Sequence, residues 1–136
     1  MEFLQQNLLL VALCASSGLM FLWSFFQASA ANNVGAAEAT RLINNDAVVV
    51  DVREPGEFSV GHIAGARNIP LGKLGDRSNE LEKFKGQPLV VCCAAGGRSS
   101  RACQQLKKLG FENLHNLAGG MDAWLQAGLP VKKGSK

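Results

Sequence analysis

The sequence predicts an α/β domain with a mainly parallel central sheet and helices on both of its faces. Three short runs rich in Val and Leu are typical of strands that are buried on both sides. Segments with apolar residues at helical spacing separate these runs, and such alternation implies parallel strands joined by crossover helices. The 136 residues contain no internal repeat or low-complexity tract, so one domain is expected beyond the N-terminal segment.

The individual elements follow from local patterns. Predicted strands cover residues 47–52, 88–92 and 113–117, with a brief extended piece at residues 68–69. Predicted helices cover residues 36–44, 55–58, 74–84, 99–109 and 120–127. Pro55 suits the first turn of its helix, and Gly110 suits a helix C-cap. Residues 27–35 are rich in Ala, Ser and Asn and are predicted to be a linker.

The N-terminus is predicted to be a transmembrane helix. Residues 1–30 are assigned to this anchor and the start of the linker, and residues 31–136 to the single domain. The run from Leu8 to Phe26 holds 19 residues without a charge. A helix of that run is about 28 Å long, close to the ~30 Å hydrocarbon core of a bilayer. Ala28-Ser29-Ala30 resembles a signal-peptide cleavage site, but residues 1–7 lack the basic residues of a signal peptide.

Charge and cysteine usage limit the function classes. Lys and Arg total 14 and Asp and Glu total 11, giving a formal charge of +3 without a dense basic stripe, so no nucleic-acid partner is expected. The cysteines are Cys14, Cys92, Cys93 and Cys103. No zinc-like spacing is present, and adjacent cysteines form only strained disulfides. We therefore expect no metal and no cofactor, and a reactive thiol in a reducing compartment.

A loop after the second long strand carries the expected chemistry. Cys93 lies where the strand ends, and parallel sheets bind ligands at the carboxyl ends of their strands. A helix begins directly after the loop, so its N–H groups and dipole favour an anion there. This field and Arg98 favour the thiolate of Cys93. Gly96 and Gly97 are expected to let the loop curl so that its N–H groups face one centre.

Cys93 is the candidate nucleophile, and the rest of the loop is the candidate substrate site. The expected substrate-binding residues are Ala94, Ala95, Gly96, Gly97, Arg98 and Ser99. A buried, unreactive cysteine is the plain alternative for Cys93, but the Gly-Gly-Arg-Ser continuation argues against it. Cys92 and Cys103 are interpreted as core residues.

Three separated motifs resemble the rhodanese family, over roughly residues 36–131. The first comprises Asp51-Val52-Arg53-Glu54-Pro55-Gly56-Glu57-Phe58, then Gly61-His62-Ile63-Ala64-Gly65-Ala66 and Asn68-Ile69-Pro70. The second is the loop from Cys93 to Ser99. The third comprises Leu117-Ala118-Gly119-Gly120-Met121, Trp124 and Gly128-Leu129-Pro130-Val131. All three stand in the order of the family's motifs, and the apolar N-terminus resembles that of its membrane-anchored, single-domain bacterial members.

The resemblance implies a sulfurtransferase that holds sulfane sulfur as a persulfide on Cys93. Sulfur would come from a thiosulfate-like anion or a protein persulfide and pass to a thiophilic acceptor. Asp51 and Arg53 would brace the sheet end near the loop, and His62 would be structural because a preformed thiolate needs no base. Ala94 and Ala95 depart from the family, in which basic or polar residues often stand at these positions.

The resemblance also implies a location and leaves two rival functions. We expect a single-pass protein of the bacterial inner membrane. The nearest basic residues, Arg41 and Arg53, follow the apolar run, so the domain is predicted to face the cytoplasm, with a membrane protein as a candidate partner. A tethered sulfur carrier or scaffold without turnover is one rival. A phosphatase or arsenate reductase is the other, but those place five residues between Cys and Arg, whereas four lie between Cys93 and Arg98.

Overall fold

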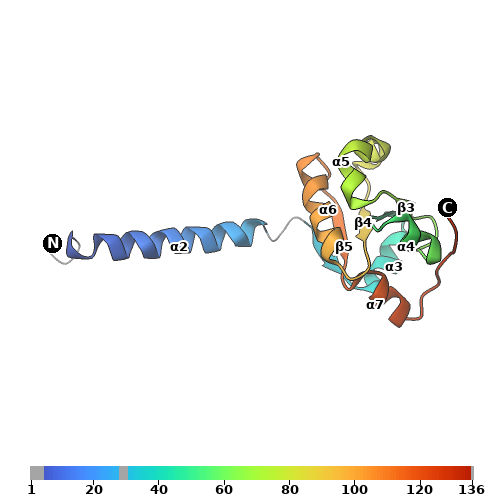
Figure 1. The fold of residues 1–136 in the computed structure, drawn as a ribbon, viewed down its shortest axis with the longest axis horizontal. Helices are drawn as coiled ribbons and strands as arrows, with labels where there is room; N and C mark the ends of the chain where they lie inside the picture. Colours follow the sequence, from blue (N-terminus) through green and yellow to red (C-terminus); the bar gives the residue numbers. More distant parts are fainter. Residues whose placement is uncertain (1–4, 28–30, 136) are drawn as a thin grey trace.

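The domain is built around a parallel sheet (Figure 1). The computed structural model describes residues 5–27 and 31–135, except the side chains of residues 23–27. Within this part of the chain the sheet has five strands in the order β1-β5-β4-β2-β3, and every neighbouring pair is parallel. The strands are β1 (Asn32–Val34), β2 (Val48–Asp51), β3 (Arg67–Asn68), β4 (Leu89–Cys92) and β5 (Leu114–Leu117). The predicted parallel α/β fold is confirmed.

Helices cover both faces of the sheet, as predicted. They are α3 (Ala36–Asn44), α4 (Pro55–Val60), α5 (Leu74–Arg77), α6 (Gly97–Lys108) and α7 (Gly120–Gln126), with 3₁₀ turns η1 (Leu71–Lys73) and η2 (Ser78–Phe84). The residues of β4 alternate between two apolar clusters because successive strand side chains point to opposite faces. Val91 packs in a cluster with residues of α5, η2 and α6. Val90 packs in the other, with residues of α3 and α7.

The predicted helix over residues 74–84 is wrong in extent. The α-helical part ends at Arg77, and the chain continues as the 3₁₀ turn η2. Only Leu74 and Leu81 in this segment are fully buried, while Phe84 is partly exposed. Two buried side chains do not make the apolar stripe that holds a longer amphipathic helix against a core.

The predicted linker over residues 27–35 contains a strand. β1 pairs in parallel with β5, so that Asn33 stands opposite Asn116. Asn32 and Asn33 are exposed and only Val34 of this strand is buried, as is typical of a short edge strand. The segment that leads into the domain is therefore part of the sheet.

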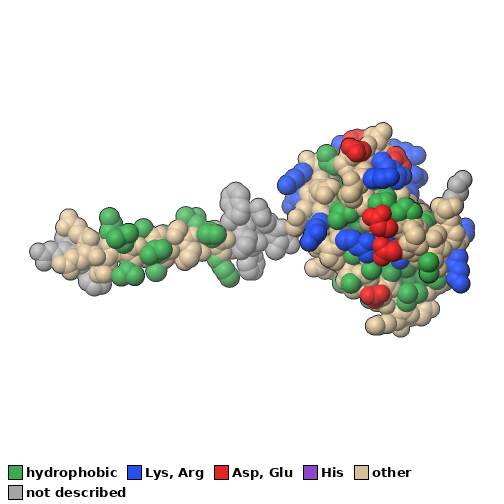
Figure 2. Space-filling view, viewed as in Figure 1, with side chains coloured by type: hydrophobic (Ala, Val, Ile, Leu, Met, Phe, Trp, Pro, Cys, Tyr) green, Lys and Arg blue, Asp and Glu red, His purple; other side chains and the backbone are tan. Residues whose placement is uncertain are grey.

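The N-terminal helix α2 (Leu8–Gln27) carries exposed apolar side chains (Figure 2). Leu9 is 80% exposed and Met20 is 76% exposed. Within the described part of the chain, no helix combines the length and the apolarity needed to cross a membrane. The predicted spanning helix is therefore not found there. The side chains from Trp23 to Phe26, and the cleavage-like residues 28–30, lie outside the described residues.

Candidate active site

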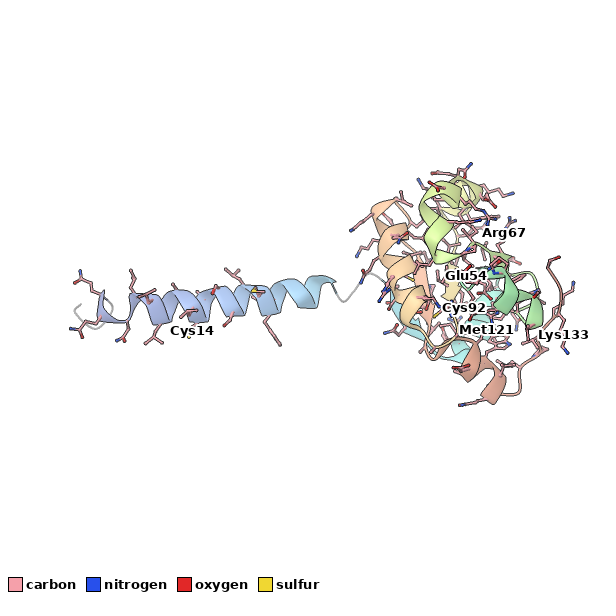
Figure 3. All side chains as sticks on the ribbon, in the orientation of Figure 1. Cys14, Glu54, Arg67, Cys92, Met121 and Lys133 are labelled. Carbon is pink, nitrogen blue, oxygen red and sulfur yellow. The ribbon has the colours of Figure 1, made fainter. Side chains whose placement is uncertain are left out.

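The site is built on the carboxyl end of β4. Cys93 follows this strand directly and is buried, with 1% of its surface exposed. It belongs to the apolar cluster on the α6 side of the sheet, whereas Cys92 belongs to the cluster on the α7 side. Figure 3 labels Cys92, the last residue of β4, and Met121 of α7, which belong to the same apolar cluster. The interpretation of Cys92 and Cys103 as buried core residues is confirmed.

The loop after Cys93 turns its backbone toward the sulfur. The Gly96 N–H donates to Cys93 Sγ at an N···S distance of 2.9 Å. Gly96 has a φ of 107°, a left-handed conformation that favours glycine, and helix α6 begins at the next residue. The predicted curled loop is therefore present. Gly97 does not share the positive φ, so its role is not to permit the turn.

Hydrogen bonds make the Cys93 thiol more acidic than an ordinary thiol. Burial alone would raise its pKa, but the Ser99 hydroxyl and the N–H groups of Ser99, Gly96 and Ala95 together lower the pKa. Burial raises the pKa of Cys92, and it raises that of Cys103 to about 12. Of these three thiols, only that of Cys93 has a lowered pKa, which favours its thiolate form.

Ser99 links the sulfur to a chain of amides. Its Oγ lies 3.4 Å from Cys93 Sγ and 3.0 Å from the Gly96 carbonyl oxygen, and it also contacts Asn116 Oδ1. Asn116 Nδ2 donates to Asn33 Oδ1 on β1 at 3.1 Å. Ser99 has one hydroxyl proton for several acceptors. When Cys93 is a thiol it can donate to Ser99, and when it is a thiolate the Ser99 proton can turn toward the sulfur.

The start of α7 holds the loop from the other side. The N–H groups of Met121 and Asp122 donate to the carbonyl oxygens of Cys93 and Ala94, at 2.8 and 3.0 Å. A Cβ on Gly120 would lie 2.3 Å from the Cys93 oxygen, and Gly120 has a φ of 57°. Only glycine allows the two backbone segments to approach so closely. The third motif of the sequence therefore clamps the loop.

Arg98 does not stand free in the loop. Its Nη1 and Nη2 donate to the two carboxylate oxygens of Glu57 at 2.7 and 2.9 Å. The Arg98 side chain is 35% exposed and that of Glu57 is 38% exposed. The bond from Arg98 lowers the pKa of Glu57 to about 2, so the carboxylate stays charged at neutral pH. Arg98, which the sequence predicts to bind an anionic substrate, is therefore engaged in an ion pair with Glu57 in this structure.

Asp51 and Arg53 lie at the same edge of the sheet, as expected. Arg53 Nη2 donates to Asp51 Oδ2 at 2.7 Å and to the Gly61 carbonyl oxygen at 2.7 Å. Asn68 Nδ2 donates to the carbonyl oxygens of both residues, at 3.1 and 2.9 Å. Asp51 stands opposite Cys92 in the register of β2 and β4. These bonds tie β2, β3 and the approach to α4 together one strand away from the loop.

The remaining predicted residues are placed less centrally. Ala94 is half-buried and Ala95 is exposed, so both lie where the loop meets solvent. His62 is buried, stacks on Phe58 with ring centroids 3.7 Å apart, and places Nδ1 2.8 Å from the Phe58 carbonyl oxygen. These contacts are those of a structural residue.

Sequence reasoning missed Glu57 and Asn116 as site residues. Glu57 stands inside the first motif, but its partner Arg98 is 41 residues further along the chain. Asn116 is a buried polar residue in the middle of a predicted strand. A polar side chain in a strand that is buried on both faces needs a hydrogen-bond partner. This requirement is the feature of the sequence that could have indicated a role for Asn116 in the site.

The chain belongs to the rhodanese-like domain family. The family model for the rhodanese-like domain matches residues 35–127. The uncharacterized protein YqhL of Bacillus subtilis is 49% identical over 78 residues, and the match spans 57% of this chain and 60% of YqhL. A protein of Allochromatium vinosum named sulfurtransferase is 36% identical over 86 residues, spanning 63% of this chain and 78% of that one.

A solved structure agrees with this assignment. The crystal structure of a rhodanese-related protein from Thermoplasma volcanium superposes with a TM-score of 0.68 at 36% identity. The match covers 74% of this chain and 97% of that one. Family membership with relatives named as sulfurtransferases supports a role in sulfur transfer for the domain.

Proposed function

We propose that the protein is a sulfurtransferase that carries sulfane sulfur on Cys93 as a persulfide. The observation that carries the proposal is the contact of Cys93 Sγ with the Gly96 N–H at 2.9 Å. N–H donors around the sulfur stabilise a thiolate, which is the form that attacks sulfane sulfur. The same donors can stabilise the negative charge of the persulfide that forms.

The proposed reaction has two balanced steps. The Cys93 thiolate attacks the terminal sulfur of a donor; a new S–S bond forms at Cys93, the donor's S–S bond breaks, and the electron pair leaves with the donor. With thiosulfate the leaving group is sulfite, and with a persulfide it is a thiolate. A thiophilic acceptor then attacks the outer sulfur, and Cys93 leaves as a thiolate again.

Cysteine variants test this proposal. Cys93→Ser should lose sulfur transfer from thiosulfate or a persulfide to cyanide, and mass spectrometry should find no added sulfur on its peptide. Cys92→Ser and Cys103→Ser are the matched controls and should retain most of the transfer, because both thiols are buried with raised pKa values. Loss in folded Cys92→Ser with retention in Cys93→Ser would refute Cys93 as the sulfur carrier. Repeated turnover distinguishes a catalyst from a sulfur carrier or scaffold, which would load once or not at all.

We also propose that α2 attaches the domain to the bacterial inner membrane, with the domain on the cytoplasmic side. The support is the set of large apolar side chains that α2 exposes, such as Leu9 and Met20, since apolar surface is costly in water. The full chain should sediment with membranes and resist carbonate extraction, and a chain lacking residues 1–30 should be released. Protease should reach the domain only in inverted vesicles; a full-length chain in the soluble fraction would refute the attachment.

A further inference from the structure

The ion pair between Arg98 and Glu57 uses the charge that would otherwise attract an anion. The fork of Arg98 meets both oxygens of Glu57, which is the geometry that Arg and carboxylate groups favour. Glu57 is fixed from a second side, because its Oε1 accepts the Glu54 N–H at 3.2 Å in a capping box at the start of α4. The carboxylate is thus held in place before any substrate arrives.

The other groups described at this edge of the sheet do not replace that charge. Arg53 is paired with the buried carboxylate of Asp51. Ala94 and Ala95 bring no donor side chain to the loop. The Gly96 N–H is already directed at Cys93 Sγ. A dianion entering this site would therefore meet a thiolate and the partly exposed Arg98–Glu57 ion pair, whose charges cancel.

Thiosulfate and organic persulfides, the two classes of sulfur donor, differ in the negative charge that they bring to such a site. Thiosulfate brings two negative charges to the thiolate, and without a free cation the repulsion slows the attack. A protonated organic persulfide brings none at its reacting end: the Cys93 thiolate attacks its terminal sulfur, which keeps its proton and becomes the outer sulfur of Cys93, and the organic thiolate leaves with the electron pair of the broken S–S bond.

We propose that Glu57 is a specificity-determining residue that, by occupying Arg98, makes the Cys93 site select organic persulfides over thiosulfate and other oxyanion donors. The inference rests on the proposed persulfide function. It names the class of donor as a sulfane sulfur on a thiol, carried by a small molecule or by a protein.

The test compares how two donors load reduced Cys93. Rate constants for the first sulfur added to the Cys93 peptide are measured by quenched mass spectrometry, with thiosulfate and with cysteine persulfide as the probes. Glu57→Gln removes the negative charge and keeps the capping-box geometry, since Gln serves at this position as Glu does. The ratio of thiosulfate to persulfide rate constants should rise about ten- to a hundredfold, the range expected for freeing one charged hydrogen-bonding group.

Glu54→Gln is the matched control. Glu54 is exposed, is the N-cap of the same helix and loses the same charge on substitution. Its side chain accepts the Glu57 backbone N–H, whereas Arg98 pairs with Glu57, so the ratio should stay within about twofold of the wild type. Arg98→Gln gives the opposite test and does not depend on the folding of Glu57→Gln. It leaves Glu57 as an unpaired negative charge, so the ratio should fall below that of the wild type.

The outcomes distinguish a failure of the role proposed for Glu57 from a failure of the persulfide function proposed for Cys93. An unchanged ratio in Glu57→Gln, or an equal rise in Glu54→Gln, would overturn the role of Glu57 and leave Cys93 as the sulfur carrier. Failure of both donors to load Cys93 in the wild-type chain would overturn the persulfide function and this inference with it. A role of Glu57 in stability alone would slow both donors equally and leave the ratio unchanged.

Discussion

Replacing Ser99 by Ala should make Cys93 a weaker acid. The Ser99 hydroxyl is the largest of the hydrogen-bonding contributions that lower the pKa of Cys93, against the effect of burial. A hydrogen bond to a charged group contributes about 1.5–3 kcal/mol, and the long S···O distance of 3.4 Å places this one at the low end. A loss of about 1.5 kcal/mol corresponds to roughly tenfold less thiolate at a pH below the pKa.

The measurement is the rate of alkylation of Cys93 by iodoacetamide as a function of pH, followed on its own peptide. Because Ser99 lowers the pKa of Cys93, its removal should raise that pKa and move the midpoint of the profile to higher pH. Ser100→Ala is the control, because Ser100 is an exposed serine next to Ser99 whose hydroxyl accepts from Asn116 Nδ2 at 3.4 Å rather than contacting the Cys93 sulfur. Superimposable profiles for folded Ser99→Ala and the wild type would refute the account, as would an equal shift in Ser100→Ala.

Three further substitutions test the frame of the site. Gly120→Ala should lower stability by more than about 2 kcal/mol, because a left-handed non-glycine residue costs about 1–2 kcal/mol and the Cβ would also meet the Cys93 oxygen; Gly72→Ala, with open space at its Cβ, should change the melting temperature little. Asp51→Asn should cost about 3–5 kcal/mol in urea denaturation, because it leaves a buried guanidinium without its charge partner; a loss below about 1 kcal/mol would contradict the bracing role. Arg98→Ala should raise the pKa of Glu57 from about 2 toward its ordinary value in a carboxyl NMR titration, and no change would contradict the ion pair.

The buried strands and the loop could be predicted because their signals are local. The apolar runs before Asp51 and before Cys93 are continuous, and both proved to be central strands of the sheet. The strand, the glycine turn and the following helix place Cys93 without any information from distant residues. β1 could not be recognised in this way, since Asn32 and Asn33 are polar and this edge strand gains its place from pairing with β5.

The side-chain partners in the site could not be predicted because they depend on tertiary packing. Nothing local tells that Arg98 meets Glu57 across 41 residues, or that Asn116 reaches both Ser99 and Asn33. The loop sequence alone therefore indicates a charged Arg98, and only the folded structure shows that Glu57 neutralises this charge. Patterns of apolar residues specify elements, whereas polar pairs between elements depend on the register that these elements adopt.

The placement of the cysteines bears on the lifetime of a stored sulfur. A persulfide is lost when a neighbouring thiolate attacks it, forming a disulfide and releasing hydrosulfide. Cys92 points to the opposite face of the sheet, and burial raises its pKa. Cys103 shares the cluster of Cys93, but its pKa of about 12 keeps it protonated at neutral pH. The thiols of Cys92 and Cys103 are thus poor nucleophiles toward a persulfide on Cys93. We therefore expect the persulfide to persist until an external acceptor attacks it.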